Sequence, residues 1–327
     1  MKPKVFVSRR LPEHTMNRLG ELFELSCNPH DRPLSPQELA EMSQGNEGLV
    51  SLLSDQIDEA YLTKVPSLQI VANYAVGYNN IDLKAAAARN ITVTNTPGVL
   101  TETSADAAFA LMLATARRIV EADRYMREQE WSGWYPTQFL GKDVWGAKLG
   151  IVGLGRIGEA VARRASGFSM EIGYWNRTRQ SAERERELGI TYRQLPELLT
   201  WADFVSLHLA YTPETHHLVD AKALAMMSPK SILINTSRGA VVDEQALVAA
   251  LQSGQLAGAG LDVYEHEPQL HPDLRPLNNV VLLPHLGSAS LATREGMGEL
   301  VVKNLQAFFS GQPVMNPVPL NRKEGNS

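Results

Sequence analysis

The sequence predicts an α/β fold made of two parallel sheets, each covered by helices on both faces. Short β-branched or apolar runs alternate with helical stretches along most of the 327 residues, as in sheets whose strands are joined by crossover helices. The alternation is interrupted near residue 98 and a second series ends near residue 288, so the chain divides into two domains. We expect an inserted domain, 99–287, within a discontinuous domain made of 1–98 and 288–327.

The first series contains short strands and helices. Strands are expected at 4–7, 49–53, 70–73 and 91–94, and helices at 13–22, 36–43 and 83–88. The turn at 95–98 then breaks the pattern. One long helix comes next, opened by Thr103 or Ser104 and continuing to residue 127, because few breakers occur in it and it ends in basic residues.

The second series begins near Lys148. Its strands are expected at 148–152, 170–175, 232–234, 259–263 and 280–283, followed by a final helix from about 289 to 310. The proline-rich tail after that helix has no sheet of its own and should pack on the first domain. The alternating charges at 183–187 are expected to form a solvated helix face.

Composition and charge limit the classes of partner and the cellular location that the protein can be expected to have. The formal net charge of -5 and the pI near 5.9 favour neither nucleic acid nor an anionic membrane as a partner. The single cysteine, Cys27, cannot form an intrachain disulfide, and the apolar run at the N-terminus is too short for a signal peptide. A cytoplasmic protein is expected, and no metal site is predicted.

A glycine-rich loop follows the strand at 148–152. It reads Gly153-Leu154-Gly155-Arg156-Ile157-Gly158 and opens a helical stretch. In this context the glycines allow a tight turn, close approach of a pyrophosphate and close packing of helix on strand. The phosphates would bind backbone N–H groups at the helix N-terminus, so we predict a Rossmann-like dinucleotide-binding domain. The alternative is a tight turn that binds nothing.

The end of the next strand bears on the choice of dinucleotide. It reads Asn176-Arg177-Thr178-Arg179, where an NAD site usually places an acidic residue for the ribose 2′-hydroxyl. Because arginine can bind the 2′-phosphate with a bidentate fork, we predict that NADP(H) is preferred and that NAD(H) remains possible. The alternative is that both arginines are solvent-exposed residues of a surface turn and bind no ligand.

Three polar residues follow separate apolar runs of the second series: Arg238, Glu267 and His285. The carboxyl ends of parallel strands meet at one edge of a sheet, where ligands bind. A fixed cation, a proton donor and a carboxylate that orients this donor suit the reduction of a 2-oxo acid. We therefore predict that Arg238 binds the substrate and that His285 donates a proton.

Four segments resemble a known family: GLGRIG, NTSRGAVVDE, GLDVYEHEP and LLPHLGSAS. They are similar to the signature segments of the D-isomer-specific 2-hydroxyacid dehydrogenases, and are closest to the glyoxylate/hydroxypyruvate reductase branch. The resemblance implies that Arg238, Glu267 and His285 are the catalytic residues. It also implies a set of binding residues. These are Val76 and Gly77, whose backbone amides hold the substrate carboxylate, and Thr236, Ser237 and Asp262, which lie by the cofactor with Arg238, His285 and Gly287.

The expected function is NADPH-preferring reduction of glyoxylate and hydroxypyruvate. One alternative is a 2-ketogluconate or other D-2-hydroxyacid dehydrogenase, and another is a non-enzymatic, dinucleotide-regulated binding protein of the co-repressor type. Leu53 is expected to line the substrate pocket, whereas the sequence does not decide whether Trp134 contacts the substrate. By the same resemblance, the long helix and the aromatic loop at 131–145 form the contact of a homodimer.

Overall fold

The computed structural model describes residues 1–319 and contains two compact units. Among the described residues, unit 1 comprises Met1–Leu100 and the chain from Ala289 to Pro319, and unit 2 comprises Thr101–Ser288. These bounds differ slightly from the expected 1–98 with 288–327 and 99–287. The end of the expected first domain, 320–327, lies outside the described residues.

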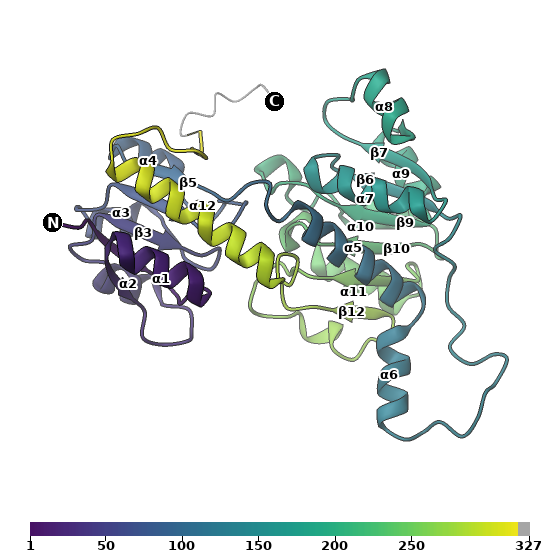
Figure 1. The fold of residues 1–327 in the computed structure, drawn as a ribbon. Coiled ribbons are helices and arrows are strands. Elements are labelled where there is room, and N and C mark those ends of the chain that lie inside the picture. The colour runs from purple at the N-terminus through teal and green to yellow at the C-terminus, as the bar shows by residue number, and fades with distance from the viewer. Residues whose placement is uncertain (320–327) are drawn as a thin grey trace. The chain divides into compact units, whose positions relative to one another are not determined.

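Unit 1 is built on a five-stranded parallel sheet with the order β2-β1-β3-β4-β5 (Figure 1). Its strands are β1 (Lys4–Val7), β2 (Glu24–Cys27), β3 (Gly48–Ser51), β4 (Ile70–Asn73) and β5 (Thr92–Thr94). Its helices are α1 (Glu13–Leu22), α2 (Pro36–Met42), α3 (Glu59–Lys64), α4 (Leu83–Ala88) and α12 (Leu291–Phe309).

Local sequence signals fix the ends of several helices in unit 1. Ser35 forms a capping box at α2, and the carboxylates of Asp58 and Asp82 accept backbone N–H groups at the starts of α3 and α4. The tail after α12 packs on the edge of the sheet, where the Val318 N–H donates to the Val93 carbonyl at 2.8 Å and the Val318 side chain is buried.

Unit 2 contains a seven-stranded parallel sheet with the order β12-β11-β10-β9-β6-β7-β8 (Figure 1). The strands are β6 (Lys148–Val152), β7 (Glu171–Trp175), β8 (Ile190–Tyr192), β9 (Phe204–Leu207), β10 (Ile232–Asn235), β11 (Gly258–Leu261) and β12 (Val280–Leu282). Because β7 and β8 lie on one side of β6 and β9 to β12 on the other, the strand order reverses between β6 and β9. Such a reversal is the usual place for a ligand in a doubly wound sheet.

Helices of unit 2 cover both faces of this sheet, except α6, which extends away from it. The helices are α5 (Thr101–Ala116), α6 (Ile119–Arg127), α7 (Arg156–Gly167), α8 (Ala182–Leu188), α9 (Leu195–Trp201), α10 (Ala221–Met226) and α11 (Glu244–Gln252), with short 3₁₀ turns at Pro213–Thr215, Gly239–Val241 and Pro272–Leu274. One core lies under α5 and α7, and a second lies under α9 to α11. The two cores explain why the central strands are apolar on both faces.

The long helix expected up to residue 127 is in fact two helices, so that prediction was wrong. Arg118, between α5 and α6, has a left-handed backbone with φ +53°. At the end of α5 the Ala116 carbonyl accepts the N–H of Lys142 at 2.8 Å. The returning segment Gly141–Lys142 thus caps α5, and the helix beyond Arg118 takes a new direction. No glycine or proline marks the break, because a tertiary contact causes it.

Other local predictions also need correction. The edge strand β2 and the helix α3 were not predicted. The run at 183–187 is helical, but its central residue, Glu185, is buried rather than solvated and accepts a hydrogen bond from the Tyr174 hydroxyl at 2.7 Å. The final helix starts at Leu291, because Ser290 caps it by accepting the Thr293 N–H.

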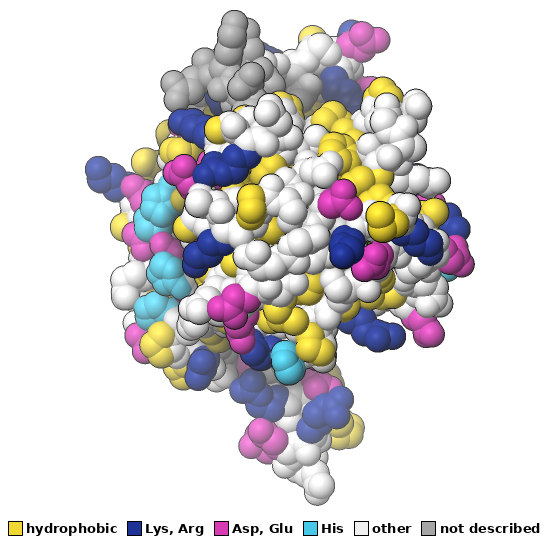
Figure 2. Space-filling view, turned by 90° about the vertical axis from the view of Figure 1, so that its left-hand side faces the viewer, with side chains coloured by type: hydrophobic (Ala, Val, Ile, Leu, Met, Phe, Trp, Pro, Cys, Tyr) yellow, Lys and Arg dark blue, Asp and Glu magenta, His cyan; other side chains and the backbone are white. Residues whose placement is uncertain are grey.

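The described surface carries mixed charge. On the face drawn in Figure 2, the described lysine and arginine side chains are interspersed with acidic and apolar ones and form no continuous basic area. Over residues 1–319, none of the helices combines the length and apolar character needed to span a bilayer.

Candidate active site

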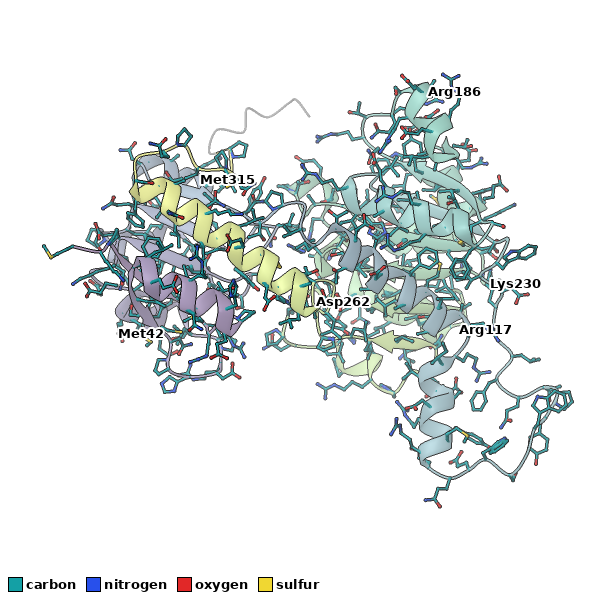
Figure 3. All side chains as sticks on the ribbon, in the orientation of Figure 1. Met42, Arg117, Arg186, Lys230, Asp262 and Met315 are labelled. Carbon is teal, nitrogen blue, oxygen red and sulfur yellow. The ribbon has the colours of Figure 1, made fainter. Side chains whose placement is uncertain are left out.

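Three of the predicted site residues of unit 2 lie where three neighbouring strands end. Arg238 follows β10, Asp262 follows β11 and His285 follows β12, and these strands are adjacent in the sheet. The His285 N–H donates to the Asp262 carbonyl at 2.9 Å, which continues the strand pairing into the loops. Figure 3 shows Asp262 at one end of unit 2 and Lys230, which precedes β10, near the other. The structure thus places these groups at the carboxyl edge of the sheet.

His285 and Glu267 form a hydrogen-bonded pair. Nδ1 of His285 lies 2.9 Å from Oε2 of Glu267, and the second carboxylate oxygen accepts the backbone N–H of Tyr264 at 3.0 Å. His285 has φ +56°, an uncommon left-handed conformation for a residue other than glycine. The carboxylate fixes the ring with its proton on Nδ1 in the neutral form, which leaves Nε2 as the other ring nitrogen for hydrogen bonding.

The carboxylate of Glu267 stays ionised in this environment. Burial acts to raise its pKa, but the hydrogen bond and charge of His285, the Tyr264 N–H and the charge of Arg238 together lower the pKa below its ordinary value. An ionised partner stabilises a positively charged imidazole. The pair is therefore suited to hold a proton and deliver it.

Arg238 stands at the start of the 3₁₀ turn Gly239–Val241. Its Nη1 donates to the Ser237 carbonyl at 2.7 Å, and its own carbonyl accepts from the Asn235 side chain at 3.0 Å. The Asn235 oxygen in turn accepts from the N–H and hydroxyl of Ser237 at 3.0 and 2.8 Å. Burial lowers the pKa of Arg238, but a guanidinium remains charged in proteins. The turn thus holds a fixed cation at the sheet edge.

Asp262 is buried and uses both carboxylate oxygens within unit 2. They accept the N–H groups of Leu286 at 2.6 Å and Gly287 at 2.8 Å. Burial raises the pKa of Asp262, while these two hydrogen bonds and the charge of His285 act in the opposite direction. A Cβ at Gly287 would lie 3.3 Å from the carboxylate. Asp262 therefore fixes the segment that carries His285, a task the sequence did not reveal.

The glycine loop after β6 has the geometry of a phosphate cradle. Gly153 has φ +98°, and a Cβ there would lie 2.8 Å from the His208 backbone at the end of β9. A Cβ at Gly158 would lie 2.3 Å from the Gly153 carbonyl oxygen, so these two glycines are required by packing. Gly155 has open space where its Cβ would be, and no side chain caps α7. Leu154, Gly155, Arg156 and Ile157 thus surround an open helix N-terminus, which fits a pyrophosphate.

The loop after β7 is tied to the glycine loop. The Asn176 side-chain oxygen accepts the Leu154 N–H at 2.8 Å, and Arg177 and Thr178 are exposed. Arg179 makes two hydrogen bonds to the Glu185 carboxylate at 2.7 and 2.8 Å. The bond from Arg179, followed by that from Tyr174, lowers the pKa of Glu185 to about 2. Glu185 therefore neutralises much of the charge that was predicted for this loop.

The predicted substrate residues Leu53, Val76 and Gly77 belong to unit 1. The Gly77 carbonyl accepts from the Asn73 side chain, and the Val76 carbonyl from the Asn95 side chain, each at 2.8 Å. These bonds hold the loop after β4 in one conformation. Leu53 follows β3 and is 39% exposed.

Sequence reasoning missed His217 and Glu244 near the site, whereas the family resemblance implied that the segment around His208 and Thr212 lines the cofactor cleft. His217 bonds to Glu265 at 2.7 Å, and Glu244 is buried at the start of α11. His208 is bonded to the Ser206 hydroxyl at 2.8 Å, and burial lowers its pKa to about 4, so its imidazole is neutral beside the glycine turn. Thr236, which was predicted, has a buried hydroxyl without a hydrogen-bond partner among the described residues. No cluster of metal-ligating side chains occurs among residues 1–319.

Comparisons with known proteins agree with this geometry. The family model of the D-isomer specific 2-hydroxyacid dehydrogenase NAD binding domain matches residues 109–287. The chain is 53% identical to a glyoxylate reductase of Korarchaeum cryptofilum, covering 95% of this chain and 94% of the relative. It is 51% identical to a glyoxylate reductase of Thermococcus litoralis, covering 95% of both chains. A solved NADPH-dependent glyoxylate/hydroxypyruvate reductase from Sinorhizobium meliloti, in complex with NADP and malonate, superposes with a TM-score of 0.88 at 38% identity over 100% of both chains.

The doubly wound fold, the glycine cradle and the edge residues define a nicotinamide-dinucleotide-dependent oxidoreductase. The chain belongs to the D-isomer-specific 2-hydroxyacid dehydrogenase family and lies on its glyoxylate reductase branch. The predicted fold class and family are confirmed.

Proposed function

We propose that this enzyme reduces glyoxylate and hydroxypyruvate to the corresponding 2-hydroxy acids, with NADPH as the preferred coenzyme and His285 as the general acid. The observation that carries the proposal is the His285–Glu267 pair beside the Arg238 turn at the carboxyl edge of one sheet. The similarity to relatives named glyoxylate reductase supports the substrate class.

In this mechanism the charge of Arg238 binds the substrate carboxylate and polarises the neighbouring carbonyl. In unit 1, Leu53 and the backbone amides of Val76 and Gly77 contribute to substrate binding. His285 gives the proton on Nε2 to the carbonyl oxygen, and Glu267 stabilises the imidazolium before transfer. Bound NADPH supplies the hydride that reduces the carbonyl carbon. One 2-oxo acid, one NADPH and one proton thus give one 2-hydroxy acid and NADP⁺.

A substrate panel tests the proposal. We expect kcat/KM with NADPH to be highest for glyoxylate and hydroxypyruvate among glyoxylate, hydroxypyruvate, pyruvate and 2-ketogluconate. A maximum at 2-ketogluconate would replace the substrate class while keeping the chemistry. Absence of turnover on every 2-oxo acid, with dinucleotide binding retained, would favour a dinucleotide-regulated binding protein instead.

For the coenzyme we propose that the glycine loop holds the pyrophosphate, that Thr236, Ser237, Asp262 and Gly287 contribute to the nicotinamide side, and that Asn176–Arg179 holds the ribose side. Arg177 is the residue best suited to bind the 2′-phosphate. Arg179 contributes less, because Glu185 already pairs with its guanidinium.

We expect Arg177→Ala to lower kcat/KM with NADPH about 10- to 100-fold, since hydrogen bonds to charged groups each contribute roughly 1.5–3 kcal/mol. The kcat/KM with NADH should change less than about twofold, because NADH has no 2′-phosphate. Arg179→Ala is the matched control and should have the smaller effect on the NADPH/NADH ratio. A strong preference of the unmodified enzyme for NADH would contradict the coenzyme proposal.

We also propose a homodimer that forms through α6 and the loop following it. Both extend from the rest of unit 2 (Figure 1), and α6 has no buried residue. The exposed apolar side chains there are Ile119, Val120, Met126, Trp131, Trp134, Tyr135, Leu140 and Trp145. Beside α6 lies a pocket of about 300 Å³ lined partly by Val120 and Thr115. Light scattering should give twice the monomer mass, and Val120→Glu should shift it toward the monomer; a monomeric unmodified enzyme would refute the dimer.

A further inference from the structure

A hydrogen-bonded cluster lies beside the catalytic residues of unit 2 and includes none of them. Its members are His217, Glu265 and Glu244. His217 comes from the loop after β9, Glu265 from the segment after β11, and Glu244 from the start of α11. The imidazole of His217 donates through Nε2 to Oε1 of Glu265 at 2.7 Å. Glu265 and Glu244 have mostly buried carboxylates, so their hydrogen bonds determine how this region packs.

The cluster holds the segment that carries Glu267. Oε2 of Glu244 accepts the Glu265 N–H at 3.0 Å, and Oε1 accepts the His271 N–H at 3.1 Å. In return, Oε2 of Glu265 accepts the Glu244 N–H at 3.3 Å. These bonds fix the backbone on both sides of Glu267. The conformation of the catalytic carboxylate therefore depends on residues two positions before it and four positions after it.

The same cluster reaches the turn that carries Arg238. The backbone N–H of His217 donates to the Ala240 carbonyl at 2.9 Å. In that turn Gly239 lies directly against the Tyr264–Glu265 peptide, since a Cβ at Gly239 would be 1.8 Å from the Tyr264 carbonyl carbon. His217 thus bonds to the Arg238 turn through its backbone and to the Glu267 segment through its side chain.

The conformation of His217 agrees with this double attachment. Its φ of +49° is unusual for a residue other than glycine, and such conformations persist where surrounding contacts determine them. Its ring also stacks on His216, with the ring centroids 4.0 Å apart. His216 is exposed and bonds to the Tyr211 hydroxyl, so it makes neither of the two attachments.

We propose that His217 and Glu265 are positioning residues that fix the Arg238 turn and the Glu267 segment relative to each other. They act through Glu267 and Arg238 and do not touch the substrate. This inference rests on the proposed function, because it assigns its effect to the catalytic step in which Glu267 and His285 take part.

The test compares His217→Ala, His217→Gln and Glu265→Gln with His216→Ala as the matched control, with glyoxylate and NADPH as substrates. We expect His217→Ala and Glu265→Gln to lower kcat about 10- to 100-fold, since small misplacements of catalytic groups have effects of this order. The KM for NADPH should stay within about twofold. Because the glutamine amide can replace the imidazole N–H, His217→Gln should recover most of the kcat, and His216→Ala should keep it.

Double variants distinguish a positioning role from a purely structural one, because only the positioning role makes the kcat loss depend on Glu267. Because His217 acts partly through Glu267, adding His217→Ala to Glu267→Gln should lower kcat by a smaller factor than His217→Ala does in the unmodified enzyme, although the losses in melting temperature still add. Losses in kcat that multiply, or an unchanged kcat in both His217→Ala and Glu265→Gln, would overturn the inference. Should His217→Ala not fold, Glu265→Gln with and without Glu267→Gln gives the same comparison. Full activity of His285→Ala would instead show that the proposed function itself has failed.

Discussion

Replacing His285 by alanine is expected to lower kcat for glyoxylate reduction by about 10²- to 10⁴-fold, the range that a positioned general acid contributes. The physical reason is the pairing of its ring with the ionised carboxylate of Glu267, which suits the ring to hold and release a proton. NADPH binding should persist, because the glycine cradle belongs to a different loop. Steady-state kinetics and a fluorescence titration with NADPH measure the two effects separately.

The control for this substitution is His30→Ala, which removes an exposed imidazole of unit 1. It should leave both kcat and the dissociation constant of NADPH unchanged. If His285→Ala kept more than a tenth of the original kcat while remaining folded, His285 could not be the general acid. A loss of NADPH binding in parallel with kcat would indicate that the histidine acts on the coenzyme instead.

The edge of the unit 2 sheet could be predicted because each strand there is an apolar run that ends at a polar residue. Arg238 and His285 each stand three positions after the end of such a strand, so their common location follows from parallel pairing alone. The glycine loop was also predictable, since Gly153 and Gly158 have steric tasks that only this residue can meet. In both cases a local pattern determined the outcome.

Long-range contacts account for the features that the sequence did not reveal. The break between α5 and α6 depends on the Lys142 N–H reaching the Ala116 carbonyl, and neither residue marks a helix end by itself. Glu185 belongs to an ordinary charged helical run, yet Arg179 and Tyr174 bury its carboxylate. The edge strand β2 was missed because its side chains are exposed or only half buried, so it lacks the apolar run that marks the central strands.

The His217–Glu265 pair illustrates the same limit at the site. The two residues are 48 positions apart, and neither belongs to an apolar run that would place it at the sheet edge. Their meeting depends on the contact of Gly239 with the Tyr264–Glu265 peptide. Two adjacent histidines after a polar turn do not reveal which of the two is shielded from solvent: His216 is exposed, whereas His217 is half buried.

Replacing Arg238 by alanine is expected to lower kcat/KM for glyoxylate by about 10²- to 10⁴-fold, because two charge-assisted hydrogen bonds to a carboxylate contribute roughly 1.5–3 kcal/mol each. Arg238→Lys should recover little of this loss. An ammonium group has no planar fork to match both carboxylate oxygens. The exposed Arg186 on α8 (Figure 3) provides the control, since Arg186→Ala removes the same charge away from the sheet edge and should leave kcat/KM unchanged.

A substrate without a carboxylate separates the binding of this group from other effects of Arg238. With methylglyoxal, whose carbonyl has no neighbouring carboxylate, the unmodified enzyme should be slow, and Arg238→Ala should reduce its rate much less than it reduces the rate with glyoxylate. The difference between the two ratios measures the interaction of the guanidinium with the carboxylate, because any general damage to the site affects both substrates. Equal losses with both substrates would mean that Arg238 supports the structure of the site or the carbonyl alone, and the carboxylate would then have to be bound elsewhere.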